Sequence, residues 1–175
     1  MPEPNISREQ QLKYINDLKK KIKDHPVVQE MFNDHEIDID ELDLIPMAFA
    51  DLDVSARTDH GVVYLSYKIL EDDQEPDIGH DHYLVHEFTH FLQQTTGDKP
   101  TKGSHDGDYL DNEFEQESFQ NQTEYISDEY GKDDAINYVN RVLDKHNVKP
   151  TEREEKAEVL LNIAFKRKNR RLNAL

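Results

Sequence analysis

Residues 84–90 read LVHEFTH, and this run is the most informative part of the chain about its fold and chemistry. On an α-helix, residues four apart lie on one face, about 5–6 Å from each other. The imidazoles of His86 and His90 can therefore reach a single Zn²⁺ ion, with Zn–N bonds of about 2.0–2.1 Å. Glu87 follows His86 directly, so it need not bind the ion and can instead accept a proton from a metal-bound water.

The residues around this run predict an amphipathic helix. Apolar side chains recur at intervals of three and four on the side away from the imidazoles, namely Leu84, Val85, Phe88, Phe91 and Leu92. We expect Asp81 as the N-cap, Gly97 as the end, and a helix from His82 to Thr96. The other face would carry His82, His86, His90, Gln93 and Gln94. The alternative is a solvated helix face with two ordinary histidines.

A third zinc ligand is available downstream, where residues 112–122 read NEFEQESFQNQ. A catalytic zinc site needs three protein ligands and an open fourth position, and two histidines with one glutamate are a recurrent set. The segment keeps approximate helical spacing as far as Tyr130 and stops at Gly131. A glutamate that borders its apolar stripe could therefore face the zinc helix.

Residues 80 to 130 resemble the gluzincin-like zinc metallopeptidases, in particular small single-domain forms often encoded by bacteriophages and bacteria. Their pattern is HExxH with a Gln-bearing continuation, then a second helix reading E-x-E-small-aromatic or E-x-E-small-Asp, and this chain has HEFTHFLQQ and EQESF. The resemblance implies that His86 and His90 are ligands and Glu87 is the general base. It makes Glu115 the third ligand, with Glu117 as the runner-up.

The same resemblance leaves one position unfilled. Relatives with Asp four residues after the third ligand use that Asp to orient a zinc-bound histidine, whereas this chain has Phe119. The partner of the histidine must then come from elsewhere. A donor that stabilises the oxyanion is also needed, and His105, Tyr109 and Tyr125 remain open candidates. The loop from Gly97 to Gly107 is a possible lid over the site.

Composition bounds the remaining possibilities. The chain has 175 residues, a net charge of −17 and no cysteine, and its mean hydropathy is −0.94. We expect a single domain over residues 1–175, with residues 1–6 disordered, no membrane span and no binding of nucleic acid. Any metal site must use nitrogen and oxygen ligands. The N-terminus has no signal-peptide pattern, so a cytoplasmic or virion-associated location is expected.

The flanking segments complete the predicted fold. Residues 7–10 form a capping box before a helix that ends at Pro26, and a short helix follows. Residues 47–68 alternate with period two, which predicts a hairpin with a turn at residues 58–61. Further helices are expected at residues 133–146 and from a capping box that begins at Thr151. The predicted fold is α+β and zincin-like, mostly helical, with a small antiparallel sheet before the zinc helix.

These features predict a zinc-dependent metallopeptidase that hydrolyses a peptide or protein substrate, with Glu87 as general base. Zincin-like enzymes align an extended substrate along an edge strand, and Val62 to Ser66 is the candidate strand, unless the hairpin is purely structural. Two other functions are compatible with the sequence. One is a virion, assembly or protein-binding component that keeps the fold without proteolysis. The other is a zinc amidase that acts on peptidoglycan cross-links.

Overall fold

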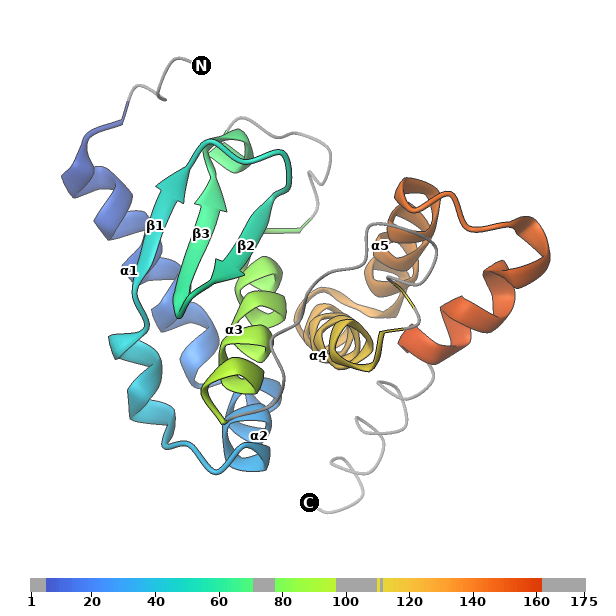
Figure 1. Cartoon of the computed structure of the whole chain (residues 1–175), viewed down its shortest axis with the longest axis horizontal. Coiled ribbons are helices and arrows are strands. Elements are labelled where there is room, and N and C mark those ends of the chain that lie inside the picture. The colour runs from blue at the N-terminus through green and yellow to red at the C-terminus, as the bar shows by residue number, and fades with distance from the viewer. Residues whose placement is uncertain (1–5, 71–77, 97–109, 111, 162–175) are drawn as a thin grey trace. The chain divides into compact units, whose positions relative to one another are not determined.

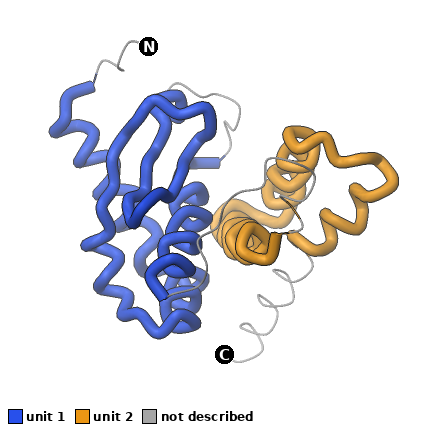
Figure 2. Tube along the Cα trace, in the orientation of Figure 1, with its two compact units in different colours: residues 1–99 blue, residues 100–175 orange. Residues whose placement is uncertain are grey.

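The computed structural model describes residues 6–70, 78–96, 110 and 112–161. The chain divides into two compact units, residues 1–99 and 100–175 (Figure 2). The expectation of a single domain stays a prediction. Disorder was expected for residues 1–6. Residues 1–5 lie outside the described residues.

The first unit begins with two helices whose ends follow the sequence signals. α1 spans Arg8–Lys23, and the predicted capping box is present: the Ser7 hydroxyl accepts from the amide of Gln10, whose side chain accepts from the amide of Ser7. α2 spans Pro26–Asp34 and has proline in its first turn, where the missing amide hydrogen costs nothing. Both helices bury one apolar face, formed by Ile15, Ile22, Val27, Val28, Met31 and Phe32.

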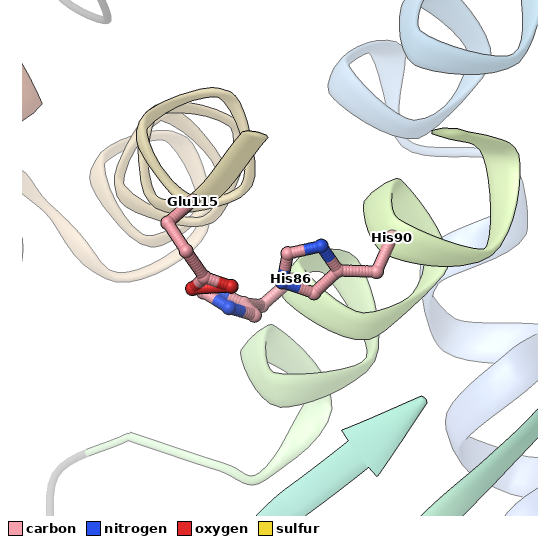
Figure 3. Close-up of side chains that lie close together, drawn as sticks. All are labelled: His86, His90 and Glu115. Atoms are coloured by element: carbon pink, nitrogen blue, oxygen red, sulfur yellow. The ribbon is translucent and has the colours of Figure 1, made fainter. Parts of the chain in front are cut away.

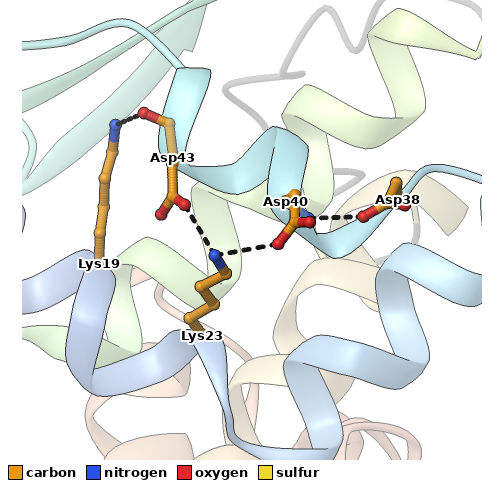
Figure 4. Close-up of polar contacts among 5 residues, drawn as sticks. All are labelled: Lys19, Lys23, Asp38, Asp40 and Asp43. Atoms are coloured by element: carbon orange, nitrogen blue, oxygen red, sulfur yellow. Dashed lines mark hydrogen bonds and ion pairs between the residues drawn. The ribbon is translucent and has the colours of Figure 1, made fainter.

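A short 3-10 helix, η1 (Ile39–Leu44), is held against α1 by two lysines. The Nζ of Lys19 is buried and donates to the carbonyls of Ile45 at 2.6 Å and Asp43 at 3.4 Å. Lys23 forms ion pairs with Asp40 and Asp43 (Figure 4). Burial lowers the pKa of Lys19, while the negative charge of Asp43 acts in the opposite direction. The amine of Lys19 therefore satisfies carbonyls where η1 ends.

The sheet of the first unit is mixed, which corrects the prediction of an antiparallel sheet. Its strands are β1 (Met47–Ala50), β2 (Ala56–Asp59) and β3 (Val62–Ser66), in the order β1-β3-β2. β2 and β3 form the predicted antiparallel hairpin, but β1 pairs in parallel with the other side of β3 (Figure 1). The period-two pattern of β1 is the same for either pairing, so it could not distinguish them.

The hairpin turn is shorter than predicted. Thr58 and Asp59, expected in the turn, belong to β2, and the turn itself is His60 and Gly61. Both turn residues have positive φ, 48° and 78°, as two-residue hairpin turns of the primed types require. β3 is consequently the central strand. This overturns the assignment of Val62 to Ser66 as an edge strand, because β2 occupies that edge.

The zinc helix of the prediction is α3, which spans Asp81–Thr95. It follows a short 3-10 helix, η2 (Tyr67–Leu70), and packs against β2, β3, α1 and α2. Four of the five residues expected on its apolar face, Leu84, Val85, Phe88 and Leu92, have no exposed surface, and Phe91 is partly buried. The predicted N-cap was wrong by one residue: the cap position is His80, and Asp81 lies in the first turn.

The described residues of the second unit form helices. α4 spans Glu113–Tyr130 and α5 spans Lys132–Lys145, separated by Gly131 at φ 113°, the predicted stop. Residues 150–161 are also helical and begin at Pro150 rather than after a Thr151 cap. The core of this unit is made by Leu110, Phe119, Ile126, Ala135, Tyr138, Val139, Val142, Leu143 and Leu160. Two hydrogen bonds join α4 to the helix at residues 150–161. The side-chain amide of Gln120 donates to the carbonyl of Val159, and the hydroxyl of Thr123 donates to the carbonyl of Leu160.

The described elements are mostly helical with one small mixed sheet, an α+β composition as predicted. No helix in the described ranges combines the length and the apolarity that a bilayer crossing requires.

Candidate metal centre

The histidine pair is built by α3 alone. His86 and His90 are one helical turn apart, and their ring centroids lie 4.9 Å from each other with the planes at 73°. Both side chains are nearly buried, with 8% and 6% of their surface exposed. The helix presents them on the side opposite its apolar face because residues at i and i+4 share a face. The predicted pairing of the two imidazoles is therefore present.

The orientation of His90 is set by a residue of its own helix. The Nδ1 of His90 lies 2.9 Å from the side-chain oxygen of Gln93, which is buried. An amide oxygen can only accept, so Nδ1 carries the proton and Nε2 presents its lone pair. Metal-binding histidines commonly donate their second ring nitrogen to such a partner. Gln93, three residues after His90, is therefore placed to orient this ring, as the position of Phe119 in the sequence is not.

Glu87 is held by the edge strand of the sheet. Glu87 is 7% exposed, and its Oε1 accepts from the hydroxyl of Thr58 at 2.9 Å. The same hydroxyl lies 3.0 Å from the backbone carbonyl of Glu87. A hydrogen bond to a charged group contributes about 1.5–3 kcal/mol, against about 0.5–1.5 kcal/mol for a neutral one, so the carboxylate is the favoured acceptor. Thr58 was placed in the turn by its sequence, and no sequence pattern connects it to Glu87.

The two candidate third ligands, both on α4, differ in how deeply they are buried. Glu115 lies in the first turn of α4, where the side chain of Asn112 accepts from the amides of Phe114 and Glu115 and caps the helix. Glu115 is 4% exposed, whereas Glu117 is only partly buried. Burial, with a contribution from Lys145, lowers the pKa of His146 at the end of α5, and the negative charge of Glu115 acts in the opposite direction. Burial favours Glu115 over Glu117 as a ligand.

His86, His90 and Glu115 form a buried cluster that could bind a metal ion (Figure 3). One ligand atom from each lies within 4.8 Å of the others. A tetrahedral Zn²⁺ with bonds near 2.0–2.2 Å holds its ligand atoms roughly 3.4 Å apart, so small side-chain movements would close the set. Two imidazoles and a carboxylate are hard-to-borderline ligands that fit such an ion. Among the described residues, this is the one group of three or more potential ligands.

The other candidate residues from the sequence are either buried or outside the described residues. His82 shares the face of His86 but is fully buried, with its ring 4.2 Å from that of Tyr83. Tyr125, a candidate oxyanion donor, is fully buried within α4. The other two candidates, His105 and Tyr109, and the loop from Gly97 to Gly107 lie outside the described residues.

A polar cluster at the start of α3 was not predicted. The hydroxyl of Tyr14 lies 2.7 Å from Nδ1 of His80, and Lys21 forms an ion pair with the buried Asp81 at 3.1 Å. Burial, and secondarily the charge of Asp81, raises the pKa of Tyr14 to about 12, so the phenol keeps its proton and shares a hydrogen bond with the His80 ring. These contacts join residues more than 50 positions apart in sequence, and local patterns carry no signal for them. They tie the N-terminus of α3 to α1.

The geometry of the site is therefore a histidine pair with an oriented ring, a held carboxylate beside it, and a buried glutamate from α4. No family model matches this chain, and no curated protein and no solved structure was found to be similar to it.

Proposed function

We propose that this protein is a zinc-dependent metallopeptidase of the zincin-like type. The observation that carries the proposal is the buried cluster of His86, His90 and Glu115, whose ligand atoms lie within 4.8 Å of one another. His₂Glu is a recurrent ligand set of catalytic zinc and leaves a fourth position for water or substrate. The direct neighbour of the first ligand is Glu87, so a potential proton acceptor is part of the same helical turn.

Each residue of the site has a distinct task in this proposal. His86, His90 and Glu115 would hold the ion, and Gln93 would keep the ring of His90 in the binding tautomer. A zinc ion held there would polarise the substrate carbonyl and lower the pKa of water to about 7. Glu87 would take a proton from the attacking water and then deliver it to the amide nitrogen that leaves. The lack of cysteine is consistent with a ligand set of nitrogen and oxygen.

The edge strand supplies a reason to propose an extended peptide as substrate. In the β2–β3 pair, the amide of Ser66 donates to Ser55, while the amide of Val63 donates to Pro46 on the other side of β3. Paired residues of an antiparallel ladder alternate between bonded and non-bonded pairs, so Thr58, opposite Val63, directs its backbone groups away from β3. Within the described residues no strand pairs with that side of β2. An extended peptide could add there through its backbone.

The partner class follows from charge. A net charge of −17 disfavours nucleic acid and would attract cationic peptides or proteins from a distance. We therefore propose a peptide or protein substrate, with basic segments favoured over acidic ones.

The experiment that tests the function compares wild type with Glu87→Gln. Both proteins are purified, their zinc content is measured, and each is incubated with an unfolded protein of basic composition, whose fragments are followed by mass spectrometry. We expect equal zinc content, cleavage by the wild type, and a loss of cleavage of at least about 10²-fold in Glu87→Gln, the lower end of typical general-base contributions.

Two results would contradict the proposal. The first is a wild type that binds no zinc. The second is cleavage that persists unchanged in Glu87→Gln, which would point to a contaminating protease. Glu117→Gln serves as the matched control, because Glu117 lies on α4 outside the cluster and should retain both zinc and cleavage.

A further inference from the structure

The direction of the Thr58 side chain is set by its position in β2 and by the register of that strand. It is the third residue of β2, where Ala56 and Thr58 are partly buried and their neighbours Arg57 and Asp59 are exposed. A strand directs alternate side chains to opposite faces, and β2 packs against α3, so Thr58 points toward the zinc helix. The two-residue turn at His60 and Gly61 fixes this register, and a slip by one residue would replace Thr58 by a charged side chain.

The hydroxyl of Thr58 leaves the two carboxylate oxygens of Glu87 unequal. Oε1 accepts the bond from Thr58 at 2.9 Å. Among the described residues, the hydroxyl is the one hydrogen-bond donor to this carboxylate. Oε1 is thus occupied by this hydrogen bond, and Oε2 is the oxygen left to accept a proton from another group. A nearly buried carboxylate with one occupied oxygen is restricted in rotation as well as in reactivity.

We propose that Thr58 is a positioning residue that holds Glu87 through Oε1 and thereby makes Oε2 the proton-accepting oxygen of the reaction. This inference rests on the proposed peptidase function and deepens it.

The proton transfers balance with Thr58 unchanged. A water oxygen forms a bond to the peptide carbonyl carbon, and the proton released from that water moves to Oε2 of Glu87. The carbon–nitrogen bond of the peptide then breaks, and Oε2 returns the proton to the leaving nitrogen. The Thr58 hydroxyl keeps its own proton throughout and acts on the reaction through Glu87.

Thr58 also connects this task to substrate binding. Its backbone groups face the open edge of β2, while its side chain contacts Glu87. A peptide that adds to the edge would therefore bind the same residue that positions the base. Displacement of a catalytic group by about 1 Å can cost about 10²-fold in rate, so a small adjustment at Thr58 is sufficient to matter.

The test uses two substitutions that separate the hydroxyl from the shape of the side chain. Thr58→Val keeps the branched shape and removes the hydroxyl, whereas Thr58→Ser keeps the hydroxyl and removes the methyl group. Zinc content, thermal unfolding, kcat and KM with the unfolded basic protein, and crystal structures are determined for both and for Arg57→Ala, an exposed neighbour on β2. Valine favours strands, so Thr58→Val is expected to fold.

We expect Thr58→Val to lower kcat by about 10- to 100-fold with unchanged zinc content and nearly unchanged KM, the range seen when a supporting partner is removed. Thr58→Ser should recover most of the lost kcat, and Arg57→Ala should not change it. In the crystal structures, Glu87 should leave its position in Thr58→Val and keep it in Thr58→Ser. A full kcat in Thr58→Val, or a Glu87 carboxylate that stays in place without the hydroxyl, overturns the proposal.

The structural readout keeps the two proposals separate. If the wild type cleaves nothing, the peptidase function fails, and with it the assignment of Oε2 as the proton acceptor. The position of Glu87 in Thr58→Val then still decides whether the hydroxyl of Thr58 holds that carboxylate.

Discussion

The two helices that carry the candidate ligands differ in how much of the site each prepares. In α3, the spacing of the helix places both imidazoles, Gln93 orients one of them, and Thr58 of the same unit holds Glu87. In α4, a single carboxylate, Glu115, comes from the first turn, whose backbone is capped by Asn112. Most of the proposed chemistry therefore lies within one unit, while the candidate third ligand comes from a second compact unit that has a core of its own.

The largest effect is expected on zinc binding, which should depend more on the histidine pair than on Glu115. His86→Ala leaves one imidazole and should abolish stoichiometric zinc binding, whereas Glu115→Gln leaves both imidazoles and should bind zinc weakly. Zinc titration of the purified variants, monitored by calorimetry, gives both results. Full zinc affinity in His86→Ala would reject the ligand assignment, and full affinity in Glu115→Gln would mean that α3 alone makes the site.

Removing the apolar support of α3 is expected to have the next largest effect. Phe88 has no exposed surface and faces away from the histidines. Phe88→Ala should lower the free energy of unfolding of the first unit by about 3–5 kcal/mol, through lost burial and the cavity left behind. Chemical denaturation followed by circular dichroism measures it. Leu12→Ala, at a side chain on α1 that is 58% exposed, is the control and should have little effect. Equal losses in both variants would contradict this packing.

A smaller effect should distinguish the caps of two helices. Asn112→Ala removes the side chain that accepts from Phe114 and Glu115, and should lower stability by about 1 kcal/mol. It should also weaken zinc binding, because the first turn of α4 carries Glu115. Ser7→Ala removes the cap of α1 at a similar cost in stability but should leave zinc affinity unchanged. Unfolding and zinc titration of the two variants are compared. Equal zinc affinities would show that the Asn112 cap does not support zinc binding by Glu115.

The smallest effect concerns the anchoring of α3 to α1 and appears only at alkaline pH. The folded-state pKa of Tyr14 is about 12, above its ordinary value of 10.0, so the unfolded chain releases the phenolic proton first. The stability that the neutral phenol contributes is fully present below pH 10 and is lost as the pH rises toward 12. The difference in Tm between wild type and Tyr14→Phe should therefore decrease over this range. Lys19, with its lowered pKa, has the opposite slope but is common to both proteins.

The local part of this architecture could be predicted from the sequence. α3 was expected at His82 to Thr96 and spans Asp81–Thr95, and the stop of α4 at Gly131 was placed correctly. These elements have a helical period of apolar residues and clear ends, both of which are short-range signals. The same is true of the histidine pair, because four residues of helix determine its geometry.

Nonlocal features could not be predicted, for identifiable reasons. The parallel pairing of β1 with β3 depends on which side of β3 the chain reaches after β1, and alternation along a strand does not encode this. The sequence placed the turn at residues 58–61, although the two-residue turn leaves Thr58 and Asp59 in the strand. Glu115 and Glu117 have the same chemistry, and only burial in the folded chain separates them.

The amine of Lys19 is nearly enclosed and occupied by two carbonyls, while Lys13 and Lys20 on the same helix are exposed. An acylating reagent should therefore modify Lys13 and Lys20 in the native protein and reach Lys19 only in molecules whose first unit has opened. Peptide mass spectrometry of that one lysine would report the rate of opening directly, without any knowledge of the substrate.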